Sequence, residues 1–115
     1  MPHDPSRAIP PAEFRVLLAL ADGSKHGHAI KLDIRTRTDG RVDMGPGTLY
    51  GAMKRLVERG WIREEAAPPG EEGDGRRKFY GLTEEGRDAA LVETRRMEEL
   101  LGIAAAKSLR EGGAA

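Results

Sequence analysis

Small, aromatic and cationic side chains gather on one side of a helix that the sequence predicts near the middle of the chain. A helix turns by about 100° per residue, and with Leu49 facing inward the outward side carries Gly47, Thr48, Tyr50, Gly51, Lys54 and Arg55. Glycines let a backbone approach a groove closely, while cations and hydroxyls bind phosphate oxygens or a guanine edge. The face therefore predicts contact with double-stranded DNA. An ordinary solvated helix face is the alternative.

The distribution of charge helps to separate these two interpretations. Nineteen basic and nineteen acidic residues give a net charge of zero, which by itself argues against a polyanionic partner. Residues 25–63, however, hold nine basic and four acidic side chains, a balance of +5 (9 − 4), and residues 64–74 hold five acids and no base. A basic stretch concentrated around the predicted helix favours nucleic acid.

Two further basic groups flank the central helix along the chain. Lys25 and His26 precede another predicted helix, and Arg76, Arg77 and Lys78 follow the acidic stretch. We expect both groups to contact the DNA backbone. A solvated loop whose cations balance the preceding acids is the alternative for the second group.

Neither catalysis nor a cofactor is expected. His26 and His28 lie only two residues apart, and His3 is the one other histidine, so a metal site lacks further ligands. The chain has no cysteine, and no nucleophile is paired with a base. The glycines of residues 45–47 form too short a run for a nucleotide-binding loop, which also needs a following lysine.

Periodicity and helix-terminus signals predict three helices, a hairpin and a long final helix. Because proline suits the first turn of a helix, two helices begin near Pro11 and Pro46, and Thr83 suits the N-cap of the last one. The predicted helices span residues 11–21, 27–38, 45–60 and 83–109, and the strands span residues 61–64 and 77–82. The fold class is mainly α with a small β-hairpin: a winged helix-turn-helix plus a long C-terminal dimerisation helix.

Apolar spacing predicts the buried face of each helix. The expected core residues are Phe14, Leu17, Leu18 and Ala21 in the first helix, and Leu49, Ala52, Met53, Leu56 and Val57 in the central one. Trp61 is expected to pack in the core. The corresponding units are a flexible tail (1–10), a DNA-binding domain (11–82), a dimerisation helix (83–110) and a second tail (111–115).

The last helix carries an apolar side that the rest of so small a domain has little surface to cover. Exposing that much apolar area is unfavourable, so we expect a second copy of the chain to bury it. The predicted seam consists of Met97, Leu100, Leu101 and Ala104. Packing within one subunit is the alternative.

Several short motifs together resemble the PadR family of bacterial regulators. They are Leu18-Ala19-Leu20, His26-Gly27-His28-Ala29-Ile30, Gly45-Pro46-Gly47-Thr48-Leu49-Tyr50, Lys54-Arg55-Leu56, Glu58-Arg59-Gly60-Trp61-Ile62, Arg76-Arg77-Lys78-Phe79-Tyr80 and Leu82-Thr83-Glu84-Glu85-Gly86. The resemblance spans residues 12–105, and the segment from Pro46 to Tyr50 is its most specific part. The chain is similar to the smaller class of the family, which has a single C-terminal helix.

The resemblance implies a homodimer that binds a palindromic operator, usually as a repressor. It also implies that the last helix packs against the partner's copy and against the partner's first helix, which adds Phe14 and Leu17 to the seam. The chain departs from the family at His28, where tyrosine is usual. The predicted hairpin, which is the wing of the fold, also has a longer and acidic tip, residues 68–75. We therefore expect the wing to contact DNA through residues 76–78, where the chain returns to the base of the hairpin.

Three expectations concern partners and location. Some relatives hold flat apolar ligands in an aromatic cavity at the dimer centre, which leaves open a small hydrophobic or aromatic effector. No stretch is apolar enough to span a membrane and none resembles a signal peptide, so we expect a cytoplasmic protein. The acidic wing tip and zero net charge leave one other hypothesis, a winged-helix protein-interaction module without specific DNA binding.

Overall fold

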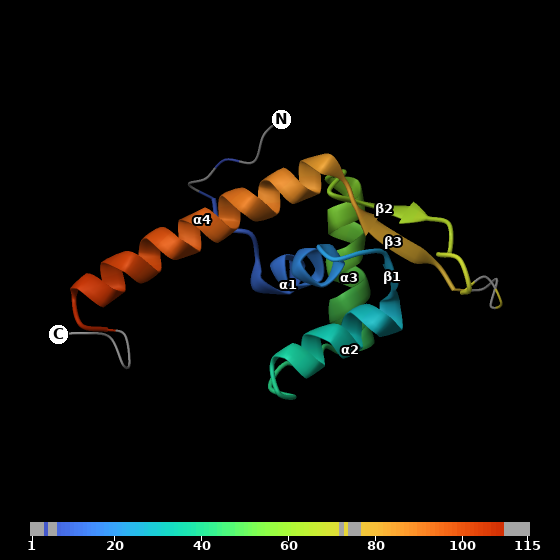
Figure 1. Ribbon diagram of the computed structural model, residues 1–115, viewed down its shortest axis with the longest axis horizontal. Helices are drawn as coiled ribbons and strands as arrows, with labels where there is room; N and C mark the ends of the chain where they lie inside the picture. The colour runs from blue at the N-terminus through green and yellow to red at the C-terminus, as the bar shows by residue number, and fades with distance from the viewer. Residues whose placement is uncertain (1–3, 5–6, 72, 74–76, 110–115) are drawn as a thin grey trace.

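The computed structural model describes residue 4, residues 7–71, residue 73 and residues 77–109. Four helices and a small three-stranded sheet follow in the order α1, β1, α2, α3, β2, β3, α4, and the sheet lies at one side of the helices (Figure 1). The bounds are α1 Pro11–Leu20, β1 Lys25–His26, α2 Gly27–Arg37, α3 Pro46–Glu58, β2 Ile62–Glu65, β3 Phe79–Leu82 and α4 Glu84–Ala106. The predicted helical class and winged helix-turn-helix order are confirmed.

Helix α1 lies at the centre of the domain, where it contacts α2, α3, α4 and β3. It therefore buries side chains on more than one face, including Val16, Leu17 and Leu20. The predicted single stripe was wrong at two positions: Leu18 is 51% exposed, and Ala21 lies beyond the helix and is exposed. A stripe assumes one buried face, whereas a central helix is covered on several sides.

The sheet has the strand order β1-β3-β2, and both pairs are antiparallel. Strands β2 and β3 form the predicted hairpin, with Ile62 opposite Leu82 and Glu65 opposite Phe79. The two-residue strand β1 was not predicted. It places Lys25 opposite Tyr80 and His26 opposite Phe79, so it ties the start of α2 to the wing.

Helix α3 packs against α1 and β2 through Leu49, Ala52, Met53 and Leu56, as predicted. Val57 was wrongly assigned to the core, because it is 44% exposed. The chain leaves the helix through Gly60, which has a positive φ of 75° and needs glycine's freedom there. Trp61 follows and is buried in the core, as expected.

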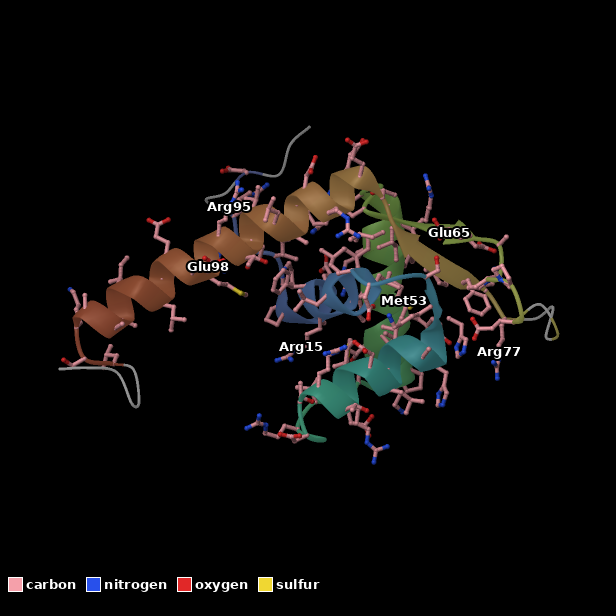
Figure 2. The ribbon with its side chains drawn as sticks, in the orientation of Figure 1. Arg15, Met53, Glu65, Arg77, Arg95 and Glu98 are labelled. Carbon is pink, nitrogen blue, oxygen red and sulfur yellow. The ribbon has the colours of Figure 1, made fainter. Side chains whose placement is uncertain are left out.

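Helix α4 begins at the predicted cap. The Thr83 hydroxyl accepts a hydrogen bond from the Gly86 amide (3.0 Å) and donates one to the Gly60 carbonyl (2.6 Å). Its first half packs against α1, whereas its second half extends away from the other elements (Figure 1). Side chains on this helix, such as Arg95 and Glu98, project from the arm into solvent (Figure 2). No helix in the described part of the chain is long and apolar enough to cross a bilayer.

The predicted seam residues divide between the exposed arm and the core. Met97, Leu100 and Leu101 are exposed on α4, and Ala104 is partly exposed. Phe14 and Leu17 are only 7% and 0% exposed within one chain, so they have almost no side-chain area left to offer a partner. Their assignment to the seam stays a prediction, although the core of the same subunit already covers them.

Candidate nucleic-acid interface

The outward face of α3 is solvent-exposed and begins with an open helix terminus. Gly45 is the N-cap and Pro46 the first helical residue, and no side chain among the described residues caps the backbone amides that follow. Gly47 and Thr48 are exposed, and Tyr50 is 57% exposed. Amides at such a terminus, together with the helix dipole, favour an anion.

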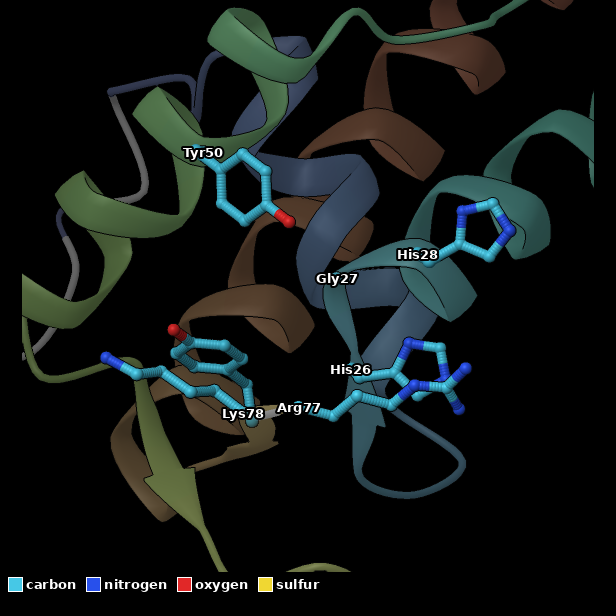
Figure 3. Close-up of a pocket in the computed structure, with 7 residues that line it drawn as sticks. His26, Gly27, His28, Tyr50, Arg77 and Lys78 are labelled. Carbon is cyan, nitrogen blue, oxygen red and sulfur yellow. The ribbon is translucent and has the colours of Figure 1, made fainter. Parts of the chain in front are cut away.

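Strand β1 and the base of the wing complete a concave site beside this terminus. A cavity of about 280 Å³ is lined by His26, Gly27, His28, Tyr50, Arg77, Lys78 and Tyr80. In Figure 3 the Tyr50 ring projects from α3 toward α2, and Arg77 and Lys78 extend from the segment before β3. The cavity thus combines cations, imidazoles and phenolic hydroxyls, a chemistry suited to phosphate.

Four of the predicted DNA-contacting residues, His26, Tyr50, Arg77 and Lys78, meet in this cavity although they are far apart in sequence. Gly27, His28 and Tyr80 also line it and were not among the predicted contacts. Strand β1 joins the start of α2 to β3 and so brings these residues together. With two residues, it is too short to show the period of a strand in the sequence. Arg76 was also a predicted contact and lies outside the described residues.

Gly27 allows Tyr50 to approach α2 closely. A Cβ atom at residue 27 would lie 3.0 Å from the Tyr50 hydroxyl oxygen and 3.3 Å from the ring. The second helix and the outward face of α3 are therefore in direct contact through this pair. A Cβ atom at residue 27 would require the exposed Tyr50 ring to shift by a few tenths of an ångström.

Two predicted cations are held by contacts within the protein. The Lys25 ammonium donates to the Ala19 carbonyl at the end of α1 (2.6 Å) and pairs with Asp22. The Arg55 Nε donates to the Glu13 carboxylate of α1 (3.2 Å). Lys54 is exposed and has no ion-pair partner within the described residues, so it is the unpaired cation on the outward face of α3.

His26 links the second helix to the wing. Its Nδ1 accepts a hydrogen bond from the Ala29 amide (3.2 Å) and so caps α2. Its ring meets Phe79 edge-on at 5.3 Å, and Arg77 Nη1 lies 3.5 Å from its Nε2. Partial burial, followed by the charge of Arg77, lowers the pKa of His26 below its ordinary value of 6.5.

The free energy of unfolding is expected to fall as the pH decreases from 7 to 5, with His26 contributing to the fall. Because the folded chain lowers the pKa of His26, the unfolded chain binds the proton more readily, and protonation favours unfolding. Urea unfolding at several pH values measures this dependence. The variant His26→Asn keeps a side-chain acceptor for the cap and should flatten it, whereas His28→Asn is the control. An unchanged pH dependence in His26→Asn would contradict the assignment.

Metal binding finds no support in the described residues, among which no group of three histidine, cysteine or acidic side chains is close enough to hold an ion. A second groove, of about 330 Å³, runs between α3 and the wing and includes Lys54, Glu58, Glu64 and Tyr80. Its two carboxylates oppose a phosphate backbone. The cationic cavity at the start of α2 is therefore the stronger candidate for a backbone contact.

The chain matches the family described as Transcriptional regulator PadR-like family over residues 16–91. Among curated proteins, the chain is 41% identical over 91 residues to an uncharacterised 37.1 kDa protein in transposon Tn4556 of Streptomyces fradiae. The match covers 79% of this chain and 24% of that protein, so the chain spans about a quarter of this relative's length.

Several solved structures are similar along most of their length. A transcriptional regulator from Clostridium thermocellum is 25% identical with a TM-score of 0.65, and the match covers 87% of this chain and 90% of that one. A PadR family regulator from Clostridium difficile is 22% identical with a TM-score of 0.67 (81% and 93%). RosR of H. salinarum is 24% identical with a TM-score of 0.63 (90% and 96%). The last two likenesses concern the fold alone.

Proposed function

The chain belongs to the PadR-like family of transcriptional regulators and is therefore a DNA-binding regulator of transcription rather than an enzyme, and from this premise we propose that it acts as a homodimeric repressor at a palindromic operator. The observation that carries the proposal is the cationic cavity where α2, α3 and the wing base meet. Residues 11–82 form the DNA-binding unit in this proposal, and residues 83–110 form the dimerisation arm.

In the proposed complex, α3 enters the major groove with Gly47, Thr48, Gly51 and Lys54 toward the bases. The cavity formed by His26, Tyr50, Arg77 and Lys78 receives a backbone phosphate at the edge of that groove. A phosphate there would face two cationic side chains and the open amino terminus of α3. The two-fold symmetry of the dimer would place the half-sites about one helical turn apart.

The proposal also covers location and control. A regulator of this kind meets its DNA in the cytoplasm. Release from the operator by a flat, hydrophobic or aromatic effector is the mode of control that the family resemblance suggests. Trp61 is a poor candidate for the wall of such a site, because it is buried and Arg59 lies 5.0 Å from its ring centre. We propose instead that an effector binds between the two α4 arms.

The Lys54→Ala variant tests the DNA contact, since it removes a cation that makes no ion pair within the described residues. DNA selected from a random library by the wild-type chain serves as the probe, and fluorescence anisotropy measures the affinity. We expect affinity to fall about tenfold to hundredfold, because a base contact contributes about 1–3 kcal/mol. The slope of log affinity against log salt should also decrease by about 1 per subunit if the lysine contacts a phosphate.

The control is Lys107→Ala, which removes an exposed cation at the far end of α4 and should leave the affinity unchanged. Two results would overturn the proposal. The wild-type chain could select no sequence from the library, which would favour a protein-interaction module. Alternatively, Lys54→Ala could bind the selected DNA as tightly as the wild-type chain.

A further inference from the structure

A buried carboxylate of α1 pairs with two arginines at one edge of the outward face of α3. Glu13 of α1 is 2% exposed, and both of its oxygens face arginines of the α3 segment. Arg55 Nε donates to Oε2 (3.2 Å), whereas Arg59 Nη1 forms an ion pair with Oε1 at 3.0 Å, and Oε1 has no hydrogen-bond partner within the described residues. A buried carboxylate is unfavourable unless it is paired, so the Glu13 carboxylate needs at least one of these arginines as a partner.

The two arginines are held in different ways. Arg59 pairs with Glu13 and also lies over the Trp61 ring at 5.0 Å, so two parts of the protein hold it. Arg55 is 53% exposed and is held through its Nε, while its Nη1 lies beside Gly51 on the outward face of α3. A Cβ atom at residue 51 would be 3.4 Å from that nitrogen. Arg55 is thus anchored on its inner edge and open on its outer edge.

We propose that Glu13 is a positioning residue that sets the sequence specificity of the protein by orienting Arg55. Arginine recognises a guanine through a planar fork of two donors, and this recognition needs a fixed orientation. A guanidinium without an anchor can instead follow any nearby phosphate, which carries no sequence information. The inference rests on the proposed binding of an operator by α3.

A purely structural role for Glu13 is the alternative, in which the ion pairs only fasten α1 to α3. The two roles differ in what happens to the freed arginine. In the structural role, loss of the carboxylate weakens folding, and DNA binding changes equally for all sequences. In the positioning role, the loss turns Arg55 from a base contact into a phosphate contact, so affinity for random DNA rises while affinity for the selected site falls.

The Glu13→Gln variant distinguishes these roles by two measurements of DNA binding. One additional arginine–phosphate pair per chain should steepen the slope of log affinity against log salt by about 0.9 for random DNA. The ratio of specific to random affinity should fall about tenfold per chain, which corresponds to one base contact. Glu98→Gln removes one exposed carboxylate from α4 and is the matched control, with no change in either quantity expected.

The Arg55→Ala variant completes a double-mutant cycle with Glu13→Gln. In that background Glu13→Gln should change neither the slope nor the ratio, because the arginine that it releases is absent. Arg55→Lys supplies a second test that leaves Glu13 paired with Arg59. It keeps a cation without the planar fork, so it should lower the ratio and preserve affinity for random DNA, even where Glu13→Gln fails to fold.

The inference is overturned if wild-type specificity persists in both Glu13→Gln and Arg55→Lys. It is also overturned if Glu13→Gln lowers only the melting temperature. A wild-type chain that prefers no DNA sequence would instead overturn the proposed function, so the two failures are distinguishable.

Discussion

Replacing Gly86 by alanine is expected to lower the free energy of unfolding by about 3 kcal/mol, the upper end for overpacking a core. The first turn of α4 lies directly against the backbone that leaves α3. A Cβ atom at residue 86 would be 2.0 Å from the Trp61 carbonyl oxygen and 3.0 Å from its Cα. That carbonyl cannot yield easily, because it also accepts the Thr83 amide at 3.0 Å.

We expect Gly86→Ala to destabilise the fold by displacing the start of α4 from the wing. The Gly86 amide donates to the Thr83 hydroxyl, which in turn donates to the Gly60 carbonyl. A methyl group at residue 86 therefore disturbs the helix cap and the exit from α3 together. Thermal unfolding followed by circular dichroism should show the melting temperature lowered by more than about 10 °C.

Gly102→Ala is the matched control within the same helix. A Cβ atom at residue 102 meets nothing within 4 Å, so only the helix preference of alanine over glycine remains. That preference should raise stability by about 0.5–1 kcal/mol. If Gly86→Ala melted at the wild-type temperature, the close packing of α4 against Trp61 would be refuted.

The double variant Leu100→Gln/Leu101→Gln is expected to be monomeric and to lose about a hundredfold or more in affinity for the operator. Met97, Leu100 and Leu101 recur three and four residues apart and are 41%, 51% and 48% exposed in the single chain. Ile103 adds to this apolar arm and is 50% exposed. A second copy would cover this surface, and loss of the linkage would remove the gain of about 10²–10⁴ that two joined modules provide.

Light scattering with size-exclusion chromatography measures the mass, and anisotropy with the library-selected DNA measures the affinity. Leu32→Gln is the control, since Leu32 is 42% exposed on α2 and lies away from the arm. The circular dichroism spectrum of the double variant should stay close to that of the wild type, because the distal half of α4 extends away from the other described elements (Figure 1). A double variant that still eluted as a dimer would place the seam elsewhere.

Leu18 is the residue of α1 that the structure offers in place of Phe14 and Leu17. It is 51% exposed, whereas the other two are buried in their own core. Leu18 is therefore the large apolar side chain of α1 that a partner's arm could still contact. The family resemblance predicted that the first helix contributes to the seam, but it could not select the side chain, because that choice depends on which faces of α1 the same subunit covers.

Much of the fold was predictable because its signals are local. A proline at the first helical position marks the starts of α1 and α3, and Thr83 with its following acids marks the start of α4. The outward face of α3 was also predictable, because its inner stripe of Leu49, Ala52, Met53 and Leu56 is regular. These features depend on side chains within one or two turns of each other.

The sequence alone determined the order of the elements, the family resemblance and the outward face of α3. Only the tertiary structure revealed strand β1, the burial of Glu13 and the distinction between Arg55, which Glu13 holds, and Lys54, which makes no ion pair within the described residues. Periodicity reports which side of one helix is apolar. It carries no information on a carboxylate paired across 42 residues or on a strand of two residues, because both depend on elements that meet only when the chain is folded.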